Sequence, residues 1–208
     1  MSATTQLPQP FNQKLRLAAL WLMSICVATV ILFTRPRISE EGLLHEVMET
    51  AGLALLIAAV MGRLWSILYI GSKKNRELVT LGPYSVTRNP LYFFSLTGLL
   101  GIGLVYGSVI LATAFFAIGI VVFHHTATRE AEFLRAKFGD IYADYAVRTP
   151  LIIPRPWLYR TSESVTFSAR ALSRTLRDCL PFLVLYPLIE LVEYLHAIGL
   201  LKPIFVIP

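Results

Sequence analysis

The residues best suited to chemistry lie close together in residues 77–92, ELVTLGPYSVTRNPLY. Asn89-Pro90 is typical of a helix start, with asparagine at the N-cap and proline at the first helical position. Tyr84, Arg88 and Tyr92 gather around that helix start, where backbone amides favour an anion. A loop that only caps a helix is the simpler alternative, but it requires none of these three side chains. The stretch therefore predicts a binding site for a carboxylate or another anion.

A second polar stretch, residues 129–145, reads REAEFLRAKFGDIYADY. Its apolar residues recur at helical spacing, and they are Leu134, Phe138, Ile141, Tyr142 and Tyr145. This pattern predicts an amphipathic helix that lies against the membrane face or against the loop of residues 77–92. For Glu130 and Glu132 the simpler interpretation is a solvated face of that helix.

Two further groups of ionisable residues lie at the ends of apolar stretches. Glu190, Glu193 and His196 are spaced i, i+3 and i+6 and share a helix face, and Glu-x-x-His is a spacing that can ligate metals in helix bundles. Only one such set exists, so we expect a helix-pairing or interfacial face and no metal site. His124 and His125 are interpreted as core or interface residues rather than as a general base.

The composition places these groups in a membrane protein. The 208 residues are 55% hydrophobic and only 15% charged, with a mean hydropathy of +0.62. These values exclude a disordered chain and argue against a water-soluble globule. Cys26 and Cys179 each lie in an apolar stretch, so no disulfide framework is indicated. The net charge of +6 fits basic loops beside a lipid bilayer, and we expect no nucleic-acid partner.

Apolar stretches long enough to cross a bilayer, which takes about 20 residues, recur along the chain. They are Leu15–Phe33, Leu43–Tyr69, residues 91–125, which are long enough for a hairpin that turns at 106–108, and residues 179–201, which either cross the membrane or lie in its interface. The sequence therefore predicts an all-α polytopic membrane protein with about four to five transmembrane helices. A helical hairpin core and a cytosolic amphipathic helix complete the expected architecture.

Three regions follow from this layout. Residues 1–70 hold two N-terminal transmembrane helices; residues 71–154 hold the core, with the hairpin 91–125 and the cytosolic helix 129–148; residues 155–208 hold a basic linker and a C-terminal membrane helix. With the N-terminus in the cytoplasm, only Arg35, Arg37 and Lys202 of the 19 basic residues lie outside. This positive-inside bias places segments 71–90 and 126–178, and any chemistry in them, on the cytoplasmic side.

The two polar motifs occur in a recognisable order. LVTxGPYxxxRNPLY, an apolar hairpin of about 35 residues, RExxFLxxxFGxxYxxY and a closing proline resemble the family of isoprenylcysteine carboxyl methyltransferases and phospholipid methyltransferases, which are integral membrane enzymes. The resemblance covers about residues 60–154. It implies that the cofactor is S-adenosylmethionine, bound in a pocket that faces the cytosol. It also implies a lipid-like or prenylated acceptor that enters from the bilayer.

The resemblance also implies which residues line the cofactor, from the loop, from the helix start and from the helix opposite. They are Arg76, Glu77, Leu78, Val79, Tyr84, Asn89, Pro90, Leu91, Tyr92 and Glu130. Physical chemistry agrees, since arginine suits the cofactor's carboxylate, Glu130 suits its ammonium or a ribose hydroxyl, and tyrosine rings suit adenine or the sulfonium. The catalytic residues stay unknown, with Arg88, Asn89 and Arg129 as candidates.

Two positions depart from the family pattern. The family commonly has histidine where this chain has Asn89, and often a second glutamate where it has Ala131. Asparagine does not titrate, so a mechanism that uses that imidazole as an acid or base is closed here. Because an amine acceptor must be deprotonated and a carboxylate need not be, the lack of an evident base favours methylation of a carboxylate.

Two alternatives stay open at the level of sequence. Asn89 and Ala131 are compatible with a catalytically silent membrane scaffold that retains the fold and binds no cofactor. Sterol reductases with a similar carboxy-terminal core use the equivalent pocket for NADPH, although they are larger and need more membrane spans. Glu130 and the short chain favour the methyltransferase over the reductase.

Overall fold

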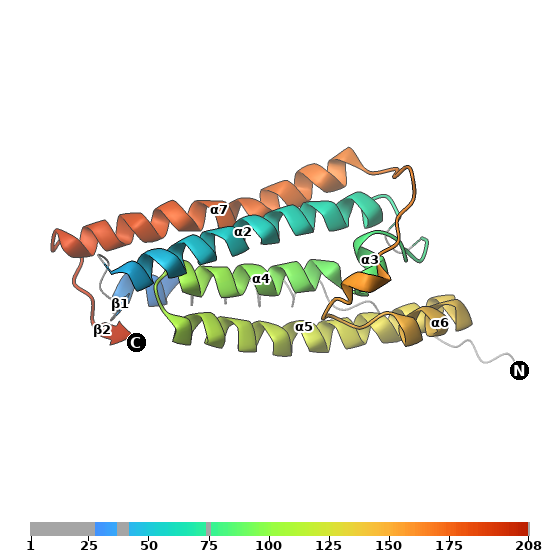
Figure 1. Ribbon diagram of the computed structural model, residues 1–208, viewed down its shortest axis with the longest axis horizontal. Coiled ribbons are helices and arrows are strands. Elements are labelled where there is room, and N and C mark those ends of the chain that lie inside the picture. The colour runs from blue at the N-terminus through green and yellow to red at the C-terminus, as the bar shows by residue number, and fades with distance from the viewer. Residues whose placement is uncertain (1–27, 37–41, 74–75, 208) are drawn as a thin grey trace, which may run out of the picture.

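The computed structural model describes residues 28–36, 42–73 and 76–207, so most of the predicted span Leu15–Phe33 lies outside the described residues. Its elements are β1 (Thr34–Pro36), α2 (Leu43–Ile70), α3 (Pro83–Val86), α4 (Pro90–Val105), α5 (Val109–Phe138), α6 (Asp140–Arg148), a 3-10 helix (Pro156–Leu158), α7 (Ala169–Ala197) and β2 (Phe205–Ile207). The long helices run side by side along the long axis of the molecule (Figure 1). The prediction of an all-α membrane protein is confirmed.

Three helices of the described part, α2, α5 and α7, are long and apolar enough to cross a membrane. The apolar helix α4 has 16 residues and is shorter. At about 1.5 Å per residue, the 30 residues of α5 are about 45 Å long and exceed the roughly 30 Å of a hydrocarbon core. The last turns of α5, which carry Arg129 and Glu130, therefore extend beyond the apolar layer.

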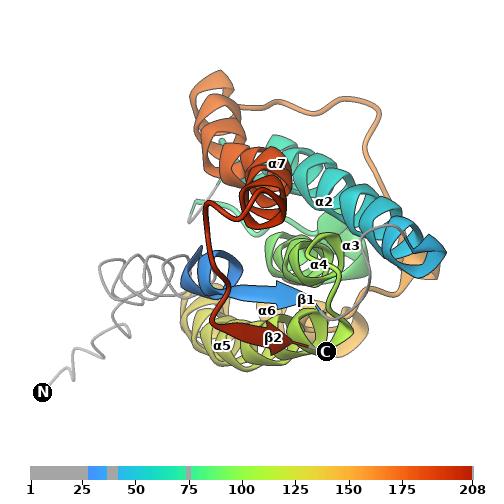
Figure 2. The same ribbon diagram turned by 90° about the vertical axis from the view of Figure 1, so that its left-hand side faces the viewer.

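Helix α4 lies at the centre of the bundle, between α2, α5 and α7 (Figure 2). Glycine lets α2 and α4 touch backbone to backbone, since a Cβ on Gly101 would lie 2.8 Å from the Gly52 carbonyl oxygen. Leu56, Leu99 and Ile102 belong to the buried cluster beside this crossing. In lipid no hydrophobic driving force acts between helices, so close packing at small residues holds α2 and α4 together, as expected for helices packed in a membrane.

The predicted hairpin turn is confirmed, but the boundaries of the helix that follows differ. Gly107 adopts φ +77° between α4 and α5, and the Ser108 side chain accepts a hydrogen bond from the Leu111 amide. The expected separate helix 129–148 is wrong, because α5 continues without a break to Phe138. The chain then turns at Gly139, with φ +56°, and α6 follows from Asp140.

For residues 179–201, which were expected either to cross the membrane or to lie in its interface, α7 is long and apolar enough to cross. It starts at Ala169, earlier than expected, includes Pro181 and Pro187, and runs beside α2 (Figure 1). The Tyr186 hydroxyl donates to Glu49 on α2 at 2.7 Å, and His196 Nε2 lies 3.2 Å from the Leu32 carbonyl oxygen. Near this end of the bundle, β1 and β2 form a two-stranded parallel sheet.

Candidate functional site

The loop before α4 is held in place by a returning segment, residues 150–160, which we call the strap. Gly82, at φ +63°, donates its amide to the Arg160 carbonyl at 2.7 Å. The Arg88 amide donates to Pro150 and the Arg155 amide donates to Val86, both at 2.9 Å. Backbone hydrogen bonds spaced along the whole loop fix its shape, so side chains on residues 82–90 point in set directions.

Helix α4 begins at Pro90 with Asn89 at the N-cap, as predicted, but the Asn89 side chain does not form the capping hydrogen bond. Its Nδ2 donates instead to the Leu151 carbonyl of the strap at 3.0 Å. The Thr87 hydroxyl lies 3.3 Å from the same carbonyl, and the carboxamide of Asn89 is the nearer of these two donors. At this helix start the Asn89 amide donates to the Thr87 hydroxyl at 3.4 Å, and the Tyr92 and Phe93 amides donate to the Asn89 carbonyl. Proline has no amide hydrogen, so the Leu91 amide is the donor of this first turn that is left for an anion among the described residues.

Buried tyrosines and Arg88 form a cluster between the loop and α6. The Tyr145 hydroxyl donates to the Tyr84 carbonyl at 2.6 Å, and Arg88 Nη1 donates to the Tyr142 hydroxyl at 3.3 Å. Tyr142 and Tyr145 are the buried residues of α6, which lies against the loop. The single apolar face expected over residues 134–145 is wrong, because the chain turns at Gly139 and Ile141 is exposed. Arg88 Nε is buried and has no hydrogen-bond partner among the described residues, which leaves a donor for an anion.

Burial keeps the phenols of this cluster protonated. Burial raises the pKa of Tyr84 well above its ordinary value, and the proximity of Tyr145, Glu130 and Tyr92 raises it further. Burial also raises the pKa of Tyr145, with a smaller contribution from Tyr142, although Arg88 acts in the opposite direction. At neutral pH both phenols are therefore hydrogen-bond donors and not bases.

Glu130 and Tyr92 complete the cluster from α5 and α4. Glu130 is half-buried on α5, makes no ion pair within the described part of the chain, and is close enough to raise the pKa of Tyr84. The Tyr92 ring stacks on Phe123 with centroids 5.1 Å apart and an angle of 12° between the planes. The structure thus brings together four residues proposed from the sequence, namely Tyr84, Arg88, Tyr92 and Glu130.

Other residues proposed from the sequence make their contacts elsewhere. Arg76 and Glu77 are exposed, and Glu77 pairs with Lys73 at 3.1 Å. Leu78 and Val79 are half-buried, and no hydrogen bond or ion pair of the described residues joins 76–79 to the tyrosine cluster. Arg129 is exposed and pairs with Glu132 at 3.7 Å on the outer face of α5, so Glu132 does not replace the missing second glutamate.

An apolar cavity beside the start of α4 was not foreseen from the sequence. Its volume is about 350 Å³, and it is lined by Trp65, Pro83, Val86, Thr87, Pro90, Phe93, Phe94, Pro154, Pro156 and Tyr159. Trp65 lies 5.8 Å from Tyr159 and 6.4 Å from Phe94, measured between ring centroids. In the sequence, the aromatic pair Phe93-Phe94 directly after the motif was the available indication of this cavity. The other wall is formed by the strap, which only the fold brings next to that pair.

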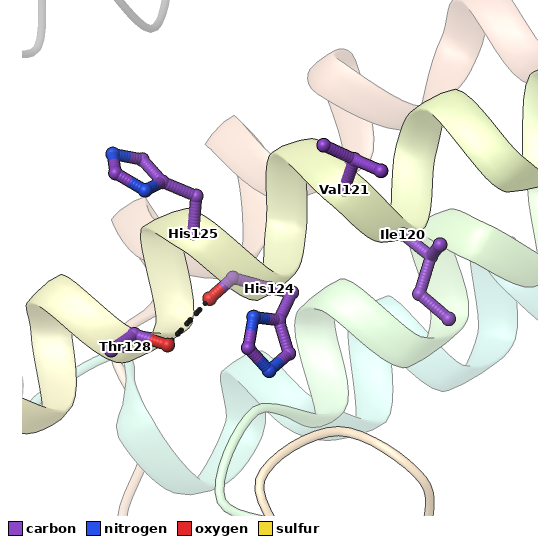
Figure 3. A pocket seen from close by; sticks show the side chains of 5 residues that line it. All are labelled: Ile120, Val121, His124, His125 and Thr128. Carbon is purple, nitrogen blue, oxygen red and sulfur yellow. Dashed lines mark hydrogen bonds between the residues drawn. The ribbon is translucent and has the colours of Figure 1, made fainter.

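A second cavity, of about 580 Å³, lies along α5, and the described part of its lining is Ile120, Val121, His124, His125 and Thr128. Figure 3 shows that His124 and His125 point in different directions from the helix. Both imidazoles are exposed, so they are not core residues. Within the described part of the chain, no group of three or more His, Cys, Asp or Glu side chains has the geometry to hold a metal ion. Glu190, Glu193 and His196 therefore do not form such a group.

Comparisons with known proteins agree with this arrangement. Residues 47–141 match the phospholipid methyltransferase family, which covers α2 through the start of α6 and includes the tyrosine cluster apart from Tyr142 and Tyr145. The chain is 37% identical over 156 residues to the cobalt-zinc-cadmium resistance protein CzcN of Cupriavidus metallidurans, covering 74% of this chain and 71% of that protein.

The chain is also 32% identical over 174 residues to the nickel-cobalt-cadmium resistance protein NccN of Alcaligenes xylosoxydans xylosoxydans, covering 84% of this chain and 81% of that protein. No solved structure matches. The ordered motifs, the membrane hairpin between them and the matched region lead to one conclusion: the chain belongs to the phospholipid methyltransferase family of membrane proteins.

Proposed function

We propose that this protein transfers a methyl group from S-adenosylmethionine to a lipophilic acceptor in the membrane, and that the acceptor group is a carboxylate rather than an amine. The observation that carries the proposal is the half-buried Arg88 guanidinium, which lies against Tyr142 of α6 in the loop that leads into α4. Its buried Nε has no partner among the described residues. A buried donor of this kind calls for an anionic ligand, and the family supports a methyltransferase.

The residues present fit the two charges at the amino-acid end of S-adenosylmethionine. Arg88 and the Leu91 amide in the first turn of α4 suit the carboxylate, because a helix N-terminus and a guanidinium both favour negative charge. Glu130, which has no ion pair in the described part, suits the ammonium group. The Tyr92 face suits adenine or the sulfonium. These four groups come from the loop, α4 and α5, so the cofactor would join three elements.

The cofactor supplies an already electrophilic methyl carbon, which an acceptor lone pair displaces in line. What the chain contributes is alignment and exclusion of water, which together lower the barrier by roughly several kcal/mol. The strap fixes the loop through backbone hydrogen bonds, and α6 covers it with two buried tyrosines. We infer that this packing holds Arg88 in position and keeps the reacting atoms dry.

The tyrosine cluster supports an acceptor that needs no base. Phenols are protonated at neutral pH even at their ordinary pKa of 10.0, and burial raises the pKa of Tyr84 and of Tyr145 further, so neither accepts a proton from an ammonium acceptor. Arginine stays protonated in proteins. An ionised carboxylate attacks without losing a proton, and this difference favours O-methylation.

Calorimetry with S-adenosylmethionine and the purified, detergent-solubilised protein tests the cofactor. We expect saturable binding to the wild type, and at least a tenfold loss of affinity, about 1.4 kcal/mol, in Arg88→Gln and in Glu130→Gln. Arg129→Gln and Glu132→Gln remove the exposed ion pair on the same helix and should change affinity by less than about twofold. Absence of binding to folded wild-type protein would favour the silent scaffold, or a nicotinamide cofactor if NADPH binds instead.

The acceptor atom is tested by incubating membranes that contain the protein with S-adenosylmethionine labelled in its methyl group. A methyl ester releases volatile labelled methanol in mild base, whereas an N-methyl group stays bound. We expect base-labile radioactivity in the lipid-extractable fraction, and none from membranes that carry Arg88→Gln. Base-stable label in that fraction would overturn the carboxylate assignment and keep the methyltransferase.

We further propose that this methylation contributes to tolerance of divalent metals, because both relatives bear the names of metal resistance proteins. The test compares growth in cobalt, zinc or cadmium of cells that express the wild type or Arg88→Gln. Equal growth of the two would remove the link between methylation and metal tolerance.

A further inference from the structure

The cavity of about 350 Å³ beside the start of α4 is built almost entirely from apolar side chains of α2, α3, α4 and the strap. Its one aliphatic hydroxyl, that of Thr87, donates to the Ile152 carbonyl of the strap at 2.9 Å and is therefore already bonded. Three aromatic rings line the cavity: the centroid of Trp65 lies 6.4 Å from that of Phe94 and 5.8 Å from that of Tyr159. A polar ring such as adenine would lose its hydrogen bonds with water on entering, at a cost that an alkyl chain does not incur.

The cavity adjoins the candidate cofactor site. Thr87 and Pro90, which line the cavity, flank Arg88 and Asn89 in the chain, so the loop that carries the guanidinium also forms part of the cavity wall. Trp65 lies near the end of α2, in the last turns before Ile70. An amphiphile whose polar group lay near Arg88 would have its apolar part at the end of the membrane-spanning helices, where such molecules reside in a bilayer.

The volume limits what the cavity holds. Sites for small ligands are typically about 300–1,000 Å³, so this cavity lies at the lower end of that range. Such a space holds one hydrocarbon chain, and the second chain of a diacyl phospholipid would lie outside it. We propose that the cavity binds the aliphatic chain of the methyl acceptor and that this acceptor is a single-chain amphiphile. This inference rests on the proposed function only in identifying the ligand as the methyl acceptor. Binding of the chain itself can be measured without the cofactor.

Fluorescence of Trp65 tests chain binding directly. In Trp21→Phe/Trp157→Phe protein, Trp65 is the single tryptophan, and bromine atoms quench tryptophan on contact. We expect 9,10-dibromostearate, added to the protein in detergent micelles, to quench Trp65 saturably, and unbrominated stearate to restore the signal. A phosphatidylcholine with one dibromostearoyl chain should quench at least tenfold more weakly on a concentration basis. Linear quenching without saturation would overturn the proposal, and equal quenching by the phospholipid would overturn its single-chain part.

Variants of the wall separate the cavity from the bulk micelle. Val86→Phe fills the space and Tyr159→Ala opens its wall, and each should weaken stearate binding at least tenfold. Tyr159 is about half exposed, at 47%, so its truncation should leave the fold intact if Val86→Phe does not. Tyr194→Ala on α7, where the tyrosine is 62% exposed, is the matched control and should bind stearate as the parent does. Unchanged binding in folded Tyr159→Ala would overturn the proposal.

Binding of S-adenosylmethionine to the same variants distinguishes the two proposals. We expect Tyr159→Ala to bind the cofactor within twofold of the wild type, and stearate and cofactor to bind together without competition. Competition between them would assign the cavity to the cofactor and overturn the acceptor proposal. Saturable stearate binding by a protein that binds no S-adenosylmethionine would refute the proposed function and leave a chain-binding site.

Discussion

Replacing Tyr145 with phenylalanine tests whether α6 holds the site loop in place. The substitution removes one hydroxyl that donates to the Tyr84 carbonyl at 2.6 Å and leaves the rest of a side chain that is 7% exposed. Loss of a donor to a buried carbonyl costs about 1–3 kcal/mol of unfolding free energy. For a chain of this length, each kcal/mol lowers the unfolding midpoint by roughly 2–4 °C. We therefore expect a measurable fall in the unfolding temperature.

The buried thiol of Cys179 provides the assay. Cys179 is fully buried in α7, at 0% exposure, and a Cys26→Ser background leaves it as the single thiol. A thiol-reactive fluorescent dye then reports unfolding, because a buried thiol is inert until it is exposed. Tyr194→Phe, at a tyrosine that is mostly exposed, is the control and should not move the midpoint. An unchanged midpoint in Tyr145→Phe would refute the argument that this hydrogen bond fastens α6 to the loop.

Three further perturbations test other parts of the structure. The pKa of Tyr84 and of Tyr145 is raised above the ordinary value of 10.0, so the folded state favours both neutral phenols. The unfolding midpoint, measured at stepped pH, should therefore hold below about pH 10 and fall as the pH rises above it. In Tyr145→Phe this fall should be less steep. Gly101→Val should destabilise the bundle by at least about 2 kcal/mol in the same assay, because even its Cβ would lie 2.8 Å from the Gly52 carbonyl oxygen of α2. An unaffected midpoint would contradict the close crossing of α2 and α4. Asn89→Ala should cost about 1 kcal/mol through the lost bond to the strap; a wild-type midpoint would indicate that the strap carbonyl finds another donor.

The membrane architecture was predictable because lipid imposes simple rules. Length and hydropathy identified α2, the hairpin and α7, and Gly107 marked the hairpin turn because a left-handed residue is needed there. The end of α5 was not predictable in the same way. The switch from apolar to charged residues at Arg129 marks where the helix leaves the hydrocarbon, but the helix itself continues to Gly139, where the backbone turns.

The candidate site was predictable in its residue types and less so in its contacts. Tyr84, Arg88, Tyr92 and Glu130 were proposed from motif and spacing, and the fold brings them together. The role of Asn89 depended on the carbonyl that faces it, and that carbonyl belongs to Leu151, 62 residues away in the chain. Local cap preferences contain no information about such a partner, so the side chain's choice between the helix and the strap could only be read from the structure.

The strap lies mostly beyond the part of the chain that carries the family motifs. The matched family region ends at residue 141, the closing proline of the motif is Pro154, and the strap covers residues 150–160. Yet the strap fixes the loop through the amides of Gly82 and Arg88, and its Pro154, Pro156 and Tyr159 form one wall of the apolar cavity. Groups that suit the cofactor's charges therefore come from the family region, whereas part of the surface that would select the acceptor comes from outside it. If acceptor choice resides in that wall, substitutions in the strap that spare its backbone hydrogen bonds should alter which chain is bound and leave the affinity for S-adenosylmethionine nearly unchanged.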